Sequence, residues 1–210
     1  APGKSVRVNP VFVADWIQTH TNIPSIFTIS PRDMNKNAIQ SLLLGAQLKG
    51  LNSVFVVKGD KFSTQDLGLQ NTVDDFKPTD LIASIKAMNE RRDFLGKELH
   101  YPTRFSIGAA LDTSRDWKNE VWLTKLKIEK GCDFLISQPG FDPELPGRFL
   151  DFYKAEIGEN LNVPILWGIQ MVDKNTVSFA SVPDWVYGNL EDGYLPYEIT
   201  ISLIERYLKK

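Results

Sequence analysis

The fold class of this 210-residue chain follows from residues 105–137, FSIGAALDTSRDWKNEVWLTKLKIEKGCDFLIS. An apolar run from Phe105 to Ala110 comes first, a segment with helical periodicity from about Trp117 to Lys130 follows, and a second apolar run covers Asp133 to Ser137. Such short apolar runs are typical of strands that are buried on both faces. A strand, a helix and a strand in succession favour a parallel pair, because a parallel connection needs a crossover that is usually a helix.

The rest of the chain repeats this alternation. Apolar runs predict further strands at Val6–Val8, Ser25–Ile29, Ser53–Val57 and Val163–Ile169. Helical patterns predict further helices at Val11–Thr19, Met34–Lys49, Pro78 to about Met88, Pro143–Ile157 and Pro196–Leu208. The pattern therefore predicts an α/β protein. It fits an open doubly wound sheet and a (β/α)8 barrel that has lost two strands equally well.

Composition excludes several classes of protein. With 24 Lys and Arg against 26 Asp and Glu, the net charge of -2 provides no basic surface for nucleic acid or anionic membranes. The single cysteine cannot form an internal disulfide, and two histidines without ligand-spaced neighbours predict no metal site. No apolar run approaches the length of a membrane helix, and the first residues lack a signal region. We expect one cytoplasmic domain, residues 1–210, that acts on a small molecule.

Polar residues at the ends of the apolar runs are the candidate site, because both architectures place their chemistry at the carboxyl ends of the strands. These positions are Asn9, Thr28–Asp33, Lys58–Asp60, Asp112, Ser137–Gln138 and Gln170. A polar loop, Lys61–Lys77, follows one of them, and structureless loops of that length are usually functional.

Local sequence leaves the role of these residues open. Gly59 would let the backbone approach a ligand, and the Asp60 carboxylate could favour a cation or take a proton, but a solvated turn explains both residues equally well. Gln138 could hydrogen-bond a planar heterocycle, or simply close a turn before Pro139. Taken alone, Lys127 is a surface lysine. The chain contains no glycine-rich phosphate loop and no nucleophile elbow.

Three stretches together resemble the methylenetetrahydrofolate reductase family, in order and at family spacing over roughly residues 5 to 190. They are Phe27–Asn35 with Ala38–Ala46, then Val54–Asp60, then Ser106–Ala110 with Lys125–Lys127 and Gly131–Asp142. The resemblance implies a (β/α)8 TIM-like barrel, here lacking the first and last strands. It also implies an FAD-dependent oxidoreductase of one-carbon metabolism and methionine biosynthesis. Hydride would pass from NADH, NADPH or a partner protein through FAD to 5,10-methylenetetrahydrofolate, or a related pterin, giving the 5-methyl form.

The resemblance also assigns site residues. Asp60 matches the catalytic acidic residue beside the flavin and the folate, where its charge favours the iminium cation that accepts hydride. Gln138 matches the glutamine that binds the pterin, and Phe141 is expected to contact the same substrate. The positions that match cofactor contacts are Thr28, Lys58, Gly59, Asp60, Ala109, Lys127 and Ile136, with Lys127 suited to the phosphates.

Several positions depart from the family pattern. The family's first strand carries a glutamate that acts as general acid, nothing before Val6 can supply it, and the nearest acids are Asp15 and Asp33. The residues Asn9, Thr28, Ser30 and Leu126 stand where Thr, His, Thr and, in some members, Arg are usual. These departures fit either a piece of a longer protein or a degenerate member of the family, and we expect the first, in a homo-oligomer or a larger complex. The alternatives are a non-catalytic flavin- or folate-binding subunit and another barrel enzyme with a phosphorylated substrate.

Overall fold

The computed structural model describes residues 6–63, 71–173, 175–176, 178 and 180–209. The chain divides into two compact units. Unit 1 comprises Ala1–Ala110 with Leu126–Phe134, and unit 2 comprises Leu111–Lys125 with Leu135–Lys210. The prediction of one domain over residues 1–210 stays a prediction.

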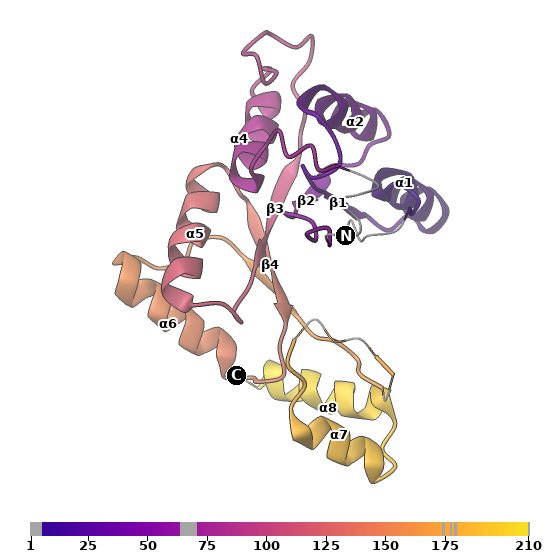
Figure 1. Cartoon of the computed structure of the whole chain (residues 1–210), viewed down its shortest axis with the longest axis vertical. Helices are drawn as coiled ribbons and strands as arrows, with labels where there is room; N and C mark the ends of the chain where they lie inside the picture. The colour runs from indigo at the N-terminus through magenta and orange to yellow at the C-terminus, as the bar shows by residue number, and fades with distance from the viewer. Residues whose placement is uncertain (1–5, 64–70, 174, 177, 179, 210) are drawn as a thin grey trace. The chain divides into compact units, whose positions relative to one another are not determined.

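Unit 1 contains a parallel sheet whose consecutive strands are connected by helices (Figure 1). Its elements are α1 (Pro10–Thr21), β1 (Ile26–Ile29), α2 (Lys36–Leu48), β2 (Ser53–Val56), α4 (Pro78–Asn89) and most of β3 (Ser106–Leu111). Strand β2 pairs in parallel with β1 on one side and with β3 on the other, so that Val56 lies opposite both Ile29 and Ala109. The carboxyl ends of the three strands therefore lie side by side.

Helix α2 illustrates how the sequence specifies these elements. The Asn35 side chain accepts a hydrogen bond from the amide of Ala38 at 2.9 Å, which caps the first turn. Ile39, Leu43 and Ala46 are fully buried on one face of the helix, as the helical spacing predicts.

The predicted strand at Val6–Val8 is wrong, because residues 6–9 form no strand. Asn9 instead caps α1, its side chain accepting from the amide of Val11 at 3.0 Å, and Pro10 is the first helical residue. Val6 and Val8 are both exposed. Three residues of alternating polarity form a strand only when another strand pairs with them. The local sequence pattern does not show whether such a strand is present.

Unit 2 holds a second parallel pair of strands and a helical pair. Its elements are β4 (Phe134–Pro139, from Leu135 on), α6 (Leu145–Ile157), β5 (Ile165–Gly168), α7 (Asp184–Glu191) and α8 (Pro196–Leu208), while α5 (Trp117–Glu129) is divided between the units. Helices α7 and α8 lie beside one another (Figure 1). Their core contains the buried residues Phe141, Val172, Val186, Leu190, Ile199 and Leu203.

The fold class predicted from the sequence is confirmed. Among the described residues, five parallel strands alternate with helices along the chain, an arrangement consistent with part of a (β/α)8 barrel. The same part of the chain includes no helix with the length and apolar character that membrane crossing requires. It also includes no cluster of three or more His, Cys, Asp or Glu side chains that could hold a metal ion.

Candidate functional site

The segments that follow β1 and β2 are joined to each other. The amide of Val57 donates to the carbonyl of Ile29 at 3.0 Å, which continues the strand pairing beyond the last ladder position. One residue further on, the Ser30 hydroxyl donates to the carbonyl of Lys58 at 2.9 Å and accepts from the amide of Arg32 at 3.2 Å. The Ser30 side chain thus continues the hydrogen bonding between the two segments beyond the last backbone pair.

Arg32 is the most heavily bonded residue at these strand ends. It is 5% exposed, and its guanidinium binds both carboxylate oxygens of Asp33, with Nε to Oδ1 at 2.6 Å and Nη2 to Oδ2 at 2.8 Å. Nη1 donates to the main-chain oxygen of Asp60 at 2.8 Å, and the guanidinium carbon lies 4.1 Å from the centre of the Phe62 ring. The hydrogen bond to Asp33 raises the pKa of Arg32 above its ordinary value, with the charges of Asp33, Asp60 and Asp74 adding to it. Arg32 therefore carries a permanent positive charge.

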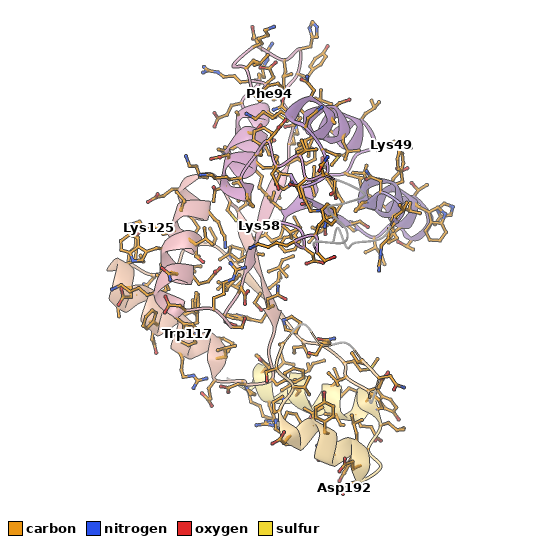
Figure 2. The ribbon with its side chains drawn as sticks, viewed as in Figure 1. Lys49, Lys58, Phe94, Trp117, Lys125 and Asp192 are labelled. Carbon is orange, nitrogen blue, oxygen red and sulfur yellow. The ribbon has the colours of Figure 1, made fainter. Side chains whose placement is uncertain are left out.

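The turn after β2 carries the residues that sequence analysis placed there. Gly59 has a φ of 83°, in the left-handed region that favours glycine, so the turn depends on this residue. Lys58, which is labelled in Figure 2, and Asp60 lie on either side of it, and both are exposed. The turn thus presents a cation and a carboxylate to solvent at the carboxyl end of β2.

A cavity of about 800 Å³ in unit 1 runs along β1 and reaches the segment that follows this strand. Thr28, Arg32, Asp33 and Phe62 lie on its wall, and α1 contributes apolar side chains such as Ile17. Its volume lies within the range typical of small-molecule and cofactor sites, and its lining combines apolar with polar groups.

The end of β3 carries a buried lysine. Lys127 is 7% exposed, and its ammonium donates to the carbonyl of Ala110 at 2.6 Å, next to the buried residue Ala109. The interpretation from local sequence as a surface lysine is wrong, because the residue lies on the buried face of α5. Its ammonium therefore lies beside the carboxyl end of β3.

Three predicted site residues belong to unit 2. Ile136 and Gln138 on β4 are half-buried, and the main-chain oxygen of Gln138 accepts from the Ser137 hydroxyl at 2.9 Å. The same hydroxyl accepts from the amide of Gly168 at 2.8 Å, which holds β4 against β5. Phe141 is 8% exposed within the core of unit 2.

The structure therefore gathers most of the predicted residues in unit 1. Thr28, Lys58, Gly59, Asp60 and Ala109 lie at the carboxyl ends of β1, β2 and β3, and the ammonium of Lys127 reaches the end of β3 from α5. Arg32 belongs to the polar segment Thr28–Asp33, but its sequence pattern predicted no role for it. Its adjacency to Asp33 in a polar segment directly after a buried strand was the available signal.

The fold and the site define an α/β protein with its polar groups at the carboxyl ends of parallel strands, the position where this class binds ligands. The family model for methylenetetrahydrofolate reductase matches residues 2–192, and the chain belongs to that family.

Two further likenesses were found. Methylenetetrahydrofolate reductase 2 of Schizosaccharomyces pombe is 23% identical over 172 residues, which cover 81% of this chain and 26% of the relative. The chain thus spans about a quarter of the length of that relative. An uncharacterized protein from Clostridium thermocellum, whose structure binds two copies of 5-methyl-5,6,7,8-tetrahydrofolic acid, is 14% identical, with a TM-score of 0.37. That alignment covers 88% of this chain and 82% of the other.

Proposed function

We propose that this chain carries the flavin and folate site of a reductase that converts 5,10-methylenetetrahydrofolate, or a related pterin, to the 5-methyl form. Membership of the methylenetetrahydrofolate reductase family supports the reaction class. The observation that carries the proposal is the Lys58–Asp60 turn, which sets a carboxylate at the carboxyl end of β2, between the ends of β1 and β3.

The residues at these strand ends fit FAD, which when bound would accept hydride from a donor and supply it to the folate. The cavity of about 800 Å³ offers room along β1, where Thr28 lies on the wall. Gly59 has no side chain to keep a ring away from the backbone. Lys58 and Lys127 supply positive charge near the ends of β2 and β3, suited to the cofactor's phosphates. Ala109 and Ile136 are the proposed apolar contacts.

Asp60 is the proposed catalytic residue. A folate that is about to accept hydride carries positive charge on its iminium group, and a fixed carboxylate nearby stabilises that charge. Asp60 is exposed, and its main chain is held by Arg32. A carboxylate on a fixed main chain needs less reorganisation when the charge develops, which favours electrostatic stabilisation of a transition state.

Gln138 is the proposed pterin contact. Its amide offers one acceptor and two donors, which suits the alternating donors and acceptors of a pterin edge. Phe141 is the second proposed substrate contact, although only 8% of it is exposed, so that a contact would be made through the edge of the ring. The proposed electron donor is a reduced nicotinamide or a partner protein, and the proposed setting is a homo-oligomer or larger complex in the cytoplasm.

An absorption spectrum of the purified protein tests this proposal. We expect bound flavin, and we expect anaerobic addition of 5-methyltetrahydrofolate to bleach its visible bands, because the reverse reaction reduces the flavin. A flavin that binds but never bleaches would instead identify a non-catalytic binding subunit. A colourless protein that cannot be reconstituted with FAD would contradict both.

A further inference from the structure

Arg32 contacts two described stretches of the chain that follow β2. Its guanidinium binds the first stretch, through the main-chain oxygen of Asp60 and the ring of Phe62. Its own carbonyl accepts from the amide of Val73 in the second stretch at 2.7 Å. Arg32, which lies three residues after the end of β1, is therefore a common anchor for two parts of the chain that lie eleven or more positions apart.

The guanidinium itself is held in place by Asp33. The two hydrogen bonds to the carboxylate fix the plane of the guanidinium, and the Phe62 ring lies on one side of it. A guanidinium has a rigid fork of donors, so fixing two of them also fixes the direction of the third, which reaches Asp60. A lysine at this position has one mobile ammonium and cannot keep the same three contacts in one plane.

The contact to Asp60 is made to its main chain and leaves the carboxylate available for chemistry. Arg32 is 5% exposed, and the Asp60 side chain is exposed. The buried Arg32 guanidinium thus fixes the main chain of Asp60 without bonding to the oxygens of the exposed carboxylate. Positioning of this kind matters, because a displacement of about 1 Å in a reacting group can cost about 100-fold in rate.

We propose that Arg32 is a positioning residue that acts through Asp60, by holding the main chain from which the Asp60 carboxylate projects. The inference rests on the proposed function for the role of Asp60. Arg32 also lies on the wall of the cavity proposed for FAD, but in this scheme it acts on the folate half-reaction through the main chain of Asp60.

A double-mutant cycle between Arg32→Lys and Asp60→Asn tests the inference in the flavin-loaded protein. We expect Arg32→Lys alone to slow the folate half-reaction by about 10- to 100-fold. Reduction of the flavin by the donor should change by less than about 3-fold. In the Asp60→Asn background, Arg32→Lys should change the folate half-reaction by less than about 2-fold, because the group it positions has gone. The exposed Arg104 provides a matched control, and Arg104→Lys should leave both half-reactions unchanged.

Additive effects in the cycle would overturn the inference, and so would equal slowing of the two half-reactions. If Arg32→Lys does not fold, Asp33→Asn replaces it in the same cycle. This change weakens the two hydrogen bonds that fix the Arg32 guanidinium, so the same coupling to Asp60→Asn is expected.

Amide hydrogen exchange separates this inference from the proposed function. Arg32→Lys should speed exchange by about 10-fold or more at the amides of Val57 and Val73, which donate to the carbonyls of Ile29 and Arg32, whether or not flavin binds. A wild-type protein that binds no flavin contradicts the proposed function alone. Unchanged exchange at these two amides overturns the positioning role.

Discussion

The ammonium nitrogen of Lys127 lies 2.6 Å from the carbonyl oxygen of Ala110, with 7% of the lysine exposed. A lysine is seldom buried without a partner, and here the end of β3 provides one. The same residue is the proposed phosphate contact, so its structural and binding roles have to be separated by experiment.

Lys127→Met should weaken FAD binding about 10- to 100-fold, because it removes a charge-assisted contact worth about 1.5 to 3 kcal/mol while keeping most of the apolar stem. Fluorescence titration with FAD measures the affinity, and a thermal melt measures the structural effect. The control is Lys125→Met on the same helix, whose ammonium lies over the Trp122 ring and which should bind FAD like the wild type. Equal affinity in Lys127→Met would remove the phosphate role.

Asp60→Asn should leave folding intact and slow the folate half-reaction by about 100-fold or more, with little effect on flavin reduction by the donor. The physical reason is that the carboxylate's charge matters most when the substrate becomes a cation, so that its loss affects rate more than binding. Stopped-flow absorbance of the flavin measures each half-reaction separately. Equal slowing of both would make Asp60 a structural residue.

Gln138→Ala should raise the folate dissociation constant about tenfold, the effect of losing about one good hydrogen-bonded pair. Isothermal titration with 5-methyltetrahydrofolate measures it. Asn160→Ala is the matched control, since Asn160 is an exposed amide outside the proposed site. A Gln138→Ala protein with unchanged affinity would show that the side chain merely closes the turn before Pro139.

Phe141→Ala should lower the free energy of unfolding by about 3 kcal/mol, since Phe141 lies in the core of unit 2. Leu150→Ala, at a position that is 39% exposed on α6, should cost about 1 kcal/mol or less. Urea denaturation measures both. Phe141→Leu keeps most of the volume, so a large loss of folate affinity in that variant would support the proposed substrate contact, and normal affinity would leave Phe141 a core residue.

Stability should fall at high pH because of Cys132. Burial raises the pKa of this thiol from 9.0 to about 11, although backbone hydrogen bonding at Phe134 and the charge of Lys127 lower it in part. The folded state keeps the thiol proton more tightly than the unfolded state, so the contribution of the thiol is full below pH 9 and is lost as pH rises towards about 11. The loss should be about 2 to 3 kcal/mol. Urea denaturation at pH 8 and pH 11 should show this loss in the wild type and a smaller one in Cys132→Ala.

Much of the secondary structure could be predicted from local pattern. Pro196–Leu208 forms α8 within the predicted bounds, and Pro78 begins α4 as expected. Such elements depend on a periodic apolar face and on terminal residues, both of which are local. Helix α7 was not predicted, because its eight residues follow Pro183 without a side-chain cap and carry only a short apolar pattern.

The sequence by itself determined the α/β class and the positions of the polar strand ends, because strand and helix periods and glycine turns such as Gly59 are properties of neighbouring residues. Only the tertiary structure decided which polar groups are buried and what they bind. The register that sets Ile29 opposite Val56 brings Arg32 to the main chain of Asp60, 28 positions away. Likewise, the packing of α5 takes Lys127 to the end of β3. Contacts across such separations depend on strand register and helix packing, which arise from the whole sheet and leave no mark on a local stretch of sequence.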